Sequence, residues 1–196
     1  MVISESHRFI FIAVPKTGSS SVETALESYT SKLTREFNKH ATCRRLIRDL
    51  PPQMWESYFK FAFVRNPYDR IESWYFYRKR PELSDPKHPR HKMYTGDKTF
   101  EEFVHWFPKN TMMLLQVGFL APLGELLVDH VGRFETLEED FALICQKLNL
   151  PEIALPKIRP SQREPASDIW TPASRRIIND YFAKDFAFFD YPIIAP

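Results

Sequence analysis

A buried strand that runs through a short turn into a helix constrains this chain more than any other feature. Residues 9–14 form a continuous apolar run rich in β-forming side chains, which predicts a strand buried on both faces. The apolar positions then change to helical spacing, in the series Val22, Ala25, Leu26, Tyr29 and Leu33. The start of the chain is therefore predicted to be a strand–turn–helix unit.

The turn between this strand and helix has the composition of an anion-binding site. It reads Pro15-Lys16-Thr17-Gly18-Ser19-Ser20-Ser21. Gly18 can adopt a positive φ, and the first amides of a helix have no carbonyl partner within the helix. These amides, the hydroxyls and the Lys16 ammonium together predict an anion site at the start of the helix. An ordinary turn with a serine N-cap and a solvated lysine is the alternative.

The residue order separates this turn from the Walker A motif, in which the lysine directly follows the second glycine. Here Lys16 precedes the glycine of the turn. The order instead resembles the 5′-phosphosulfate loop of sulfotransferases that use 3′-phosphoadenosine 5′-phosphosulfate. The resemblance implies that the 5′-phosphosulfate is bound by Lys16, Thr17, Gly18, Ser19, Ser20 and Ser21.

A second strand-to-helix junction carries another motif. Residues 60–65 form a short apolar strand, and Asn66 followed by Pro67 fits an N-cap with proline at the first helical position. The stretch resembles the second signature of the same family, in which an arginine at the strand end and a serine eight residues later hold the 3′-phosphate. The resemblance assigns Arg65 and Ser73 to this phosphate, with Arg65 at an exposed strand end. A guanidinium offers a phosphate two parallel donors.

Two further stretches resemble the family. In relatives a segment ending in Asn-x-Ser-x-x folds over the nucleotide, and here Arg159 stands where asparagine is common. Only Ser161 and Arg163 therefore carry over as nucleotide-binding residues. Around residues 131–141 the family pattern recurs, and it implies that Glu135 is a buried, orienting carboxylate.

A general base for the acceptor proton is expected to be His40. His40 lies outside the apolar stripe of the neighbouring helix, which by itself is typical of a surface histidine. Many bacterial members of the family, however, carry a His-Ala-Thr segment at this place. An imidazole titrates near neutral pH and so suits this role. The alternatives are Glu36, and His88 or His91 from a proline-rich, basic loop at residues 78–98, which is either a substrate lid or a solvated excursion.

Local signals place further helices and one more strand. Thr42 is expected to cap a short helix, and Thr171 to open the last one. Residues 99–102 and 136–139 fit capping boxes that open two helices. Residues 126–134 resemble a further strand.

The predicted elements describe an α/β fold. Apolar strands that each run into a loop and a helix predict a central, mostly parallel sheet with helices on both faces and ligand loops at the carboxyl ends of the strands. No repeat or linker interrupts the chain, which predicts a single domain over residues 1–196. The resemblance implies the three-layer, P-loop nucleotide-hydrolase-like version of this fold.

Size and charge bound the class of protein. The 196 residues suffice for one domain, and the net charge of +2 is too small for general nucleic-acid binding. Cys43 and Cys145 have no metal-ligand spacing around them and are expected to be buried, reduced thiols. The sequence has no leader and no long apolar run, which predicts a cytoplasmic protein without a transmembrane segment.

The resemblance to type-2, bacterial sulfotransferases implies an enzyme with 3′-phosphoadenosine 5′-phosphosulfate as donor and no metal. It would move the sulfuryl group to a hydroxyl or amine of a small-molecule or carbohydrate acceptor and release 3′,5′-adenosine bisphosphate. Lys16 and His40 would be the catalytic residues. One alternative is a P-loop-like kinase or nucleotidase, which the position of Lys16 disfavours. The other is a non-catalytic anion-binding module, which would be marked by loss of Lys16 or of the base. The acceptor and the oligomeric state are not predicted.

Overall fold

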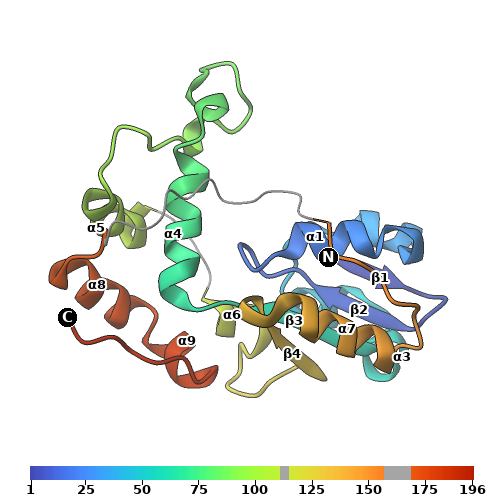
Figure 1. Ribbon diagram of the computed structural model, residues 1–196. Coiled ribbons are helices and arrows are strands. Elements are labelled where there is room, and N and C mark those ends of the chain that lie inside the picture. Colours follow the sequence, from blue (N-terminus) through green and yellow to red (C-terminus); the bar gives the residue numbers. More distant parts are fainter. Residues whose placement is uncertain (111–114, 157–168) are drawn as a thin grey trace. The chain divides into compact units, whose positions relative to one another are not determined.

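The computed structural model describes residues 1–110, 115–156 and 169–196 (Figure 1). The chain divides into two compact units. The first is formed by residues 1–65 and 115–156, and the second by residues 66–110 and 169–196. The single domain expected from the sequence stays a prediction.

A four-stranded sheet is the centre of the first unit. Its strands are β1 (Val2–Ser4), β2 (Phe9–Ile12), β3 (Phe59–Val64) and β4 (His130–Arg133), in this order across the sheet. β1 is antiparallel to β2, whereas β2, β3 and β4 are parallel. All residues of β1 and β2 are buried, and the Phe11 and Phe61 rings stack across β2 and β3 at 5.1 Å. The mostly parallel sheet is therefore confirmed, although the last strand is shorter than predicted.

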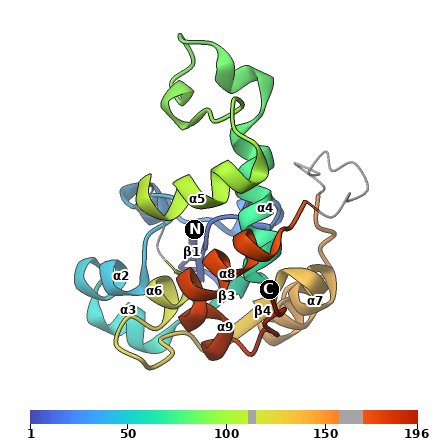
Figure 2. The same ribbon diagram turned by 90° about the vertical axis from the view of Figure 1, so that its left-hand side faces the viewer.

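Helices surround this sheet. They are α1 (Ser19–Ala25), α2 (Cys43–Asp49), α3 (Pro52–Ser57), α6 (Gln116–Leu120) and α7 (Leu137–Lys147), with short 3-10 turns η1 (Glu27–Tyr29), η2 (Lys32–Glu36) and η5 (Phe134–Thr136). In Figure 2, α7 lies on one side of the strands, and α2 and α3 lie on the other. The Thr42 hydroxyl accepts from the Arg45 amide at 3.3 Å, which confirms the predicted cap of α2. Cys43 and Cys145 are buried, free thiols, as expected.

The first helix is shorter than its apolar stripe predicts. α1 ends at Ala25, and the chain continues in 3-10 turns instead of reaching Leu33 as one helix. The reason is the open edge of β1. The Ser31 amide donates to the Ile3 carbonyl at 2.8 Å, and the Thr34 hydroxyl accepts from the Ile3 amide at 2.9 Å. Residues that would extend the helix are used to satisfy the unpaired backbone of an edge strand.

The start of α7 also differs from the prediction. The Thr136 side chain makes no capping bond to the helix, so the expected capping box over residues 136–139 is wrong. The Asp140 carboxylate instead binds the residues that precede the helix: its Oδ2 accepts from the Arg133 amide at 2.6 Å and from the Thr136 hydroxyl at 2.9 Å. Glu135 is exposed, so its expected burial is wrong as well.

The second unit is helical in its described part. Its helices are α4 (Pro67–Arg78), α5 (Phe100–Asn110), α8 (Pro172–Tyr181) and α9 (Ala183–Phe188), with 3-10 turns η3 (Pro81–Ser84) and η4 (His91–Met93). Three predicted helix starts are confirmed. Asn66 caps α4, Thr99 and Glu102 bond reciprocally before α5, and Thr171 forms a capping box with Ser174. Local signals therefore place these helices correctly.

The segment over residues 78–98 is more ordered than the predicted loop. The Thr95 amide donates to the Arg78 carbonyl at 3.2 Å, and Arg78 Nη1 donates to the Met93 carbonyl at 3.3 Å. Leu83 is buried, and its carbonyl lies 2.9 Å from His91 Nδ1. The segment is thus a folded excursion that returns to the end of α4.

Candidate functional site

The turn after β2 has an unusual backbone. Lys16 has a φ of 70° and Gly18 a φ of 77°, both in the left-handed region. A Cβ on Gly18 would lie 2.6 Å from Leu137 Cδ2 and 3.2 Å from Phe134 Cδ2, so the turn passes against η5 and the start of α7. Non-glycine residues adopt the left-handed conformation rarely, and the residues that do so are concentrated at functional sites. The turn is therefore held in a strained shape by its packing.

Side chains of the turn brace it and supply donors. The buried Thr17 hydroxyl donates to the Val14 carbonyl at 2.9 Å and ties the turn to the end of the strand. α1 has Gly18 as its N-cap, so no side chain caps the first amides of this helix. Ser20 and Ser21 are half-buried in its first turn. The start of α1 therefore has the uncapped amides and the serine hydroxyls that the predicted anion site requires.

Arg65 lies beside this turn, because β2 and β3 are parallel and end at the same edge of the sheet. Its Nη1 donates to the Lys16 carbonyl at 3.3 Å, and its guanidinium carbon lies 3.9 Å from the centre of the Phe134 ring. Gln116 fixes its backbone: Oε1 accepts from the Arg65 amide and Nε2 donates to the Arg65 carbonyl, each at 2.9 Å. Arg65 is only 6% exposed, so the expectation of an exposed strand end is wrong.

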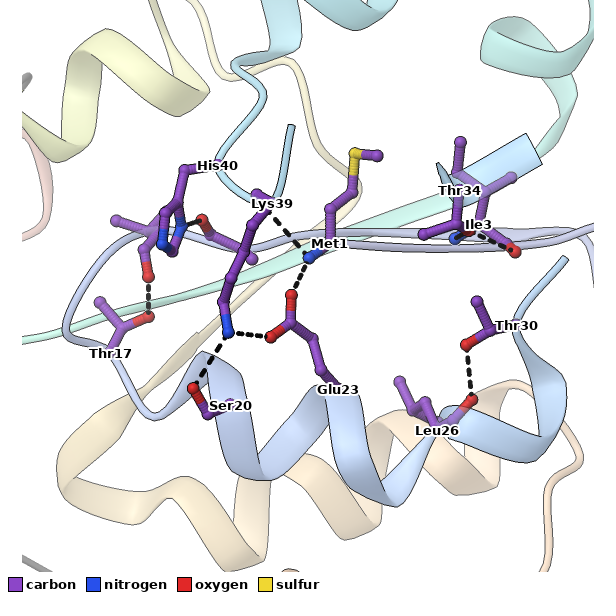
Figure 3. A network of polar contacts seen from close by, with 12 residues as sticks. Met1, Ile3, Thr17, Ser20, Glu23, Leu26, Thr30, Thr34, Lys39 and His40 are labelled. Atoms are coloured by element: carbon purple, nitrogen blue, oxygen red, sulfur yellow. Dashed lines mark hydrogen bonds and ion pairs between the residues drawn. The ribbon is translucent and has the colours of Figure 1, made fainter. Parts of the chain in front are cut away.

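His40 reaches the same end of the sheet from a different part of the chain. Its Nδ1 lies 2.7 Å from the carbonyl oxygen of Ala13, the residue that follows β2 (Figure 3). A carbonyl can only accept, so Nδ1 carries the proton and Nε2 of the neutral ring is left as an acceptor. Desolvation lowers the pKa of His40, an effect that the hydrogen bond to Ala13 partly offsets. A neutral imidazole with a defined acceptor nitrogen is what a general base requires.

An ion pair that the sequence analysis missed lies next to His40. Lys39 Nζ donates to the Ser20 hydroxyl at 3.0 Å and pairs with Glu23 (Figure 3). The other carboxylate oxygen of Glu23 binds the Met1 amino group. Met1 and Lys39 are distant in sequence from Ser20 and Glu23, so the only signal in the sequence is a lysine next to the candidate histidine.

The remaining predicted nucleotide-binding residues are Ser73, Ser161 and Arg163, and their role stays a prediction. Ser73 lies on α4, in the second unit, and its pairing with Arg65 stays a prediction. Ser161 and Arg163 lie outside the described residues.

The alternative bases have different surroundings. Glu36 is exposed at the end of η2. His88 and His91 belong to the second unit; His88 Nδ1 accepts from the Arg90 amide at 3.0 Å, and His91 Nδ1 lies against the Leu83 carbonyl. Of these four candidates, the structure ties His40 to the residue that follows β2.

The described residues hold neither a membrane-spanning helix nor a cluster of metal ligands. Within residues 1–110, 115–156 and 169–196, no helix is long and apolar enough to cross a membrane. In the same described ranges, no group of three or more His, Cys, Asp or Glu side chains could hold a metal ion.

Comparison with known proteins identifies relatives along nearly the whole chain. A model of the sulfotransferase family matches residues 1–192. Carbohydrate sulfotransferase 14 of Danio rerio is 24% identical over 98% of this chain and 62% of its own length. Carbohydrate sulfotransferase 10 of Xenopus laevis is 22% identical over 96% of this chain and 66% of its own length. Carbohydrate sulfotransferase 14 of Homo sapiens is 26% identical over 98% of this chain and 60% of its own length. The chain therefore spans about three fifths to two thirds of the length of these relatives.

Proposed function

The chain belongs to the sulfotransferase family, and we propose that it transfers a sulfuryl group from 3′-phosphoadenosine 5′-phosphosulfate to a hydroxyl or amine of an acceptor. The acceptor that we favour is a carbohydrate, because the relatives described above are named carbohydrate sulfotransferases. The observation that carries the proposal is the position of His40. It is anchored on Ala13, at the end of the strand that leads into the turn with Lys16.

The chemistry of the turn fits the phosphosulfate end of the donor. Lys16, the first amides of α1 and the serine hydroxyls are all hydrogen-bond donors, as a multiply charged anion requires. The carboxylate closest to them in sequence, Glu23, is paired with Lys39 and with the Met1 amino group. We assign residues 16–21 to the 5′-phosphosulfate.

The 3′-phosphate is assigned to Arg65 and Ser73, with Ser161 and Arg163 as further nucleotide contacts. Support for Arg65 comes from its place next to the turn, where it donates to the Lys16 carbonyl. Its guanidinium carbon lies over the Phe134 ring at 3.9 Å, and this contact restricts the side chain that would offer a phosphate two parallel donors. Ser73, Ser161 and Arg163 rest on the family resemblance alone.

The reaction needs a base and a group that stabilises the departing phosphate. When bound, the donor supplies the sulfuryl group and a phosphate that leaves with the electron pair of the broken S–O bond. His40 Nε2 accepts the proton that the acceptor hydroxyl or amine loses as its bond to sulfur forms. Lys16 neutralises the charge that grows on the bridging oxygen. A sulfuryl group carries less charge than a phosphoryl group, so we propose that Lys16 and the amides suffice without a metal ion.

The finer class of the fold is part of the same proposal. A strand–loop–helix unit next to a parallel strand supports a P-loop-like nucleotide-binding architecture for the first unit. The cytoplasmic location stays a prediction.

Transfer of radiolabelled sulfate from the 35S-labelled donor to a panel of acceptors tests the function. The panel holds neutral and acidic oligosaccharides, phenols and amines, and Lys16→Met is the inactive control. Incorporation by the wild-type protein into at least one acceptor class, lost in Lys16→Met, is expected. No incorporation together with transfer of 32P from labelled ATP would favour the kinase alternative. Donor binding without any transfer would favour a non-catalytic module.

A further inference from the structure

Lys39 contacts two residues of α1 at once (Figure 3). Its ammonium donates to the Ser20 hydroxyl at 3.0 Å and pairs with one carboxylate oxygen of Glu23. The Met1 amino group binds the other oxygen of Glu23 and donates to the Lys39 carbonyl at 3.1 Å. Lys39 is therefore held on the helix that starts at the candidate anion site, although its side chain is 45% exposed.

The bond to Ser20 has a fixed direction. An ammonium has three donors and no acceptor, so Ser20 Oγ must accept from Lys39. The Ser20 hydroxyl proton must then point to some other acceptor. Ser20 lies in the first turn of α1, directly after the turn that holds Lys16. A cation that binds the hydroxyl oxygen also strengthens the hydroxyl as a donor.

The next residue along the chain is His40. Lys39 fastens the segment to α1, and His40 fastens it to Ala13 at the end of β2. The imidazole can therefore keep its Nδ1 proton on Ala13 only while the segment stays in place.

We propose that Lys39 is a positioning residue for the transfer reaction proposed above, on which this role rests. It turns the Ser20 hydroxyl proton toward the bound 5′-phosphate, and it holds the segment that presents His40 Nε2 to the acceptor. Lys39 does not itself touch the reacting atoms. Glu23 is its clamp.

The charges around His40 support this role. The Lys39 ammonium and the Met1 amino group both disfavour the imidazolium, whereas Glu23 favours it, and desolvation is the largest influence on the lowered pKa of His40. Removal of Lys39 takes away one nearby positive charge. If the segment also loosens, desolvation is relieved and the smaller, opposite effect of the Ala13 hydrogen bond is lost with it. Because desolvation is the larger of the two effects, both changes raise the pKa of His40.

Binding of adenosine 3′,5′-bisphosphate, measured by calorimetry, tests the action on Ser20. Lys39→Met and Ser20→Ala should each weaken binding about three- to tenfold, the effect of one hydrogen bond. The double variant should bind no worse than Ser20→Ala, because the two changes remove the same interaction. Lys39→Arg, which keeps the charge and the donors, should restore most of the affinity. Lys32→Met, at an exposed lysine of η2, is the matched control and should change nothing.

NMR of the His40 ring in the ligand-free protein tests the action on the base. Lys39→Met should raise the pKa of His40 and lower the population of the tautomer protonated at Nδ1, with an unchanged melting temperature. Lys39→Arg and Lys32→Met should leave both signals as in the wild type. A merely structural role for Lys39 would lower the melting temperature instead.

The outcomes separate the two claims. If the wild type binds the bisphosphate but Lys39→Met behaves like Lys32→Met in either measurement, the role of Lys39 is wrong and the proposed function stands. A wild-type protein that does not bind the bisphosphate contradicts the proposed function and this role together.

Discussion

His40 Nδ1 donates to the carbonyl oxygen of Ala13 across 2.7 Å, which joins two residues that are 27 positions apart in the sequence. This bond selects the neutral tautomer whose Nε2 is an acceptor. Ala13 is the first residue after β2, and Lys16 follows three positions later. The two residues predicted to be catalytic are thus both attached to the end of one strand.

Replacement of His40 tests its role as the base. We expect His40→Ala to lower turnover about 10²–10⁴-fold, the usual contribution of a general base, and to leave bisphosphate affinity nearly unchanged. His105→Ala, at an exposed position of α5, is the matched control and should retain full activity. Equal losses of turnover in the two variants would return the role to Glu36, His88 or His91.

The pH profile gives a second readout of the same prediction. Only the neutral imidazole can accept a proton, so activity should rise as pH rises through the pKa of His40 and then level off. Because desolvation lowers this pKa, the midpoint should lie below the ordinary histidine value of about 6.5. The wild-type profile of kcat/KM from pH 4.5 to 8 checks it, and a midpoint above that value would contradict a neutral base held on Ala13.

Lys16 is expected to act more in the transition state than in the ground state. Charge grows on the bridging oxygen as the sulfuryl group departs, so Lys16→Met should lower kcat about 10²–10³-fold. Affinity for the bisphosphate should fall by less than about tenfold. Steady-state kinetics and calorimetry on the same preparation measure the two effects. Equal losses in both quantities would make Lys16 a binding residue alone.

Gly18 can be compared with a second glycine that has the same backbone constraint. Both Gly18 and Gly124 have positive φ, but only at Gly18 would a Cβ meet another residue, Leu137, at 2.6 Å. Gly124→Ala should therefore cost about 1–2 kcal/mol, the penalty of the left-handed conformation. Gly18→Ala should cost about 1–3 kcal/mol more, because it adds overpacking. Urea unfolding measures both, and Leu137→Ala in the Gly18→Ala background should recover part of the difference. Equal destabilisation by the two alanine variants would show that the turn does not pack on α7 as described.

The sequence predicts local features of this fold well. The first predicted strand, found at Phe9–Ile12 within the expected residues 9–14, and the N-caps Thr42, Asn66 and Thr171 depend on near neighbours, and the structure confirms them. The helix predicted to reach Leu33 fails for a non-local reason, because residues 31–34 are needed at the edge of β1. Helical spacing cannot reveal a competing partner thirty residues away.

In the candidate site, too, the features set by near neighbours were predictable and those set by distant partners were not. The turn with Lys16 and the strand end with Arg65 follow from sequence, and parallel pairing of β2 and β3 brings them together. The resemblance predicts a buried Glu135, but this residue is exposed, and it is Asp140 that accepts from the Arg133 amide. The ion pair of Lys39 with Glu23 has no sequence signature, since its partners lie on different elements.

A buried ion pair in the second unit should control stability rather than binding. Arg70 Nη1 and Asp185 Oδ2 are 3.6 Å apart, both side chains are fully buried, and burial lowers the pKa of Arg70 to about 10. Asp185→Asn removes the negative charge that balances the guanidinium and should cost about 3–5 kcal/mol of unfolding free energy. The double variant Arg70→Met with Asp185→Leu should recover most of this loss.

Chemical denaturation followed by circular dichroism checks this prediction. Asp180→Asn, at an exposed position of α8, is the control and should change stability by less than about 0.5 kcal/mol. A similarly small effect of Asp185→Asn would mean that the two side chains are hydrated in solution.

Calorimetric titration of the wild-type protein with adenosine 3′,5′-bisphosphate and with ADP, both in the presence of EDTA, shows whether the protein recognises the sulfuryl donor by both of its phosphates. A donor site with separate contacts for the 5′- and 3′-phosphates predicts that the bisphosphate binds about 10–100-fold more tightly, since a hydrogen bond to a charged phosphate is worth about 1.5–3 kcal/mol. Binding should be unchanged when magnesium replaces EDTA. Equal affinity for the two nucleotides, or a requirement for magnesium, would contradict the account.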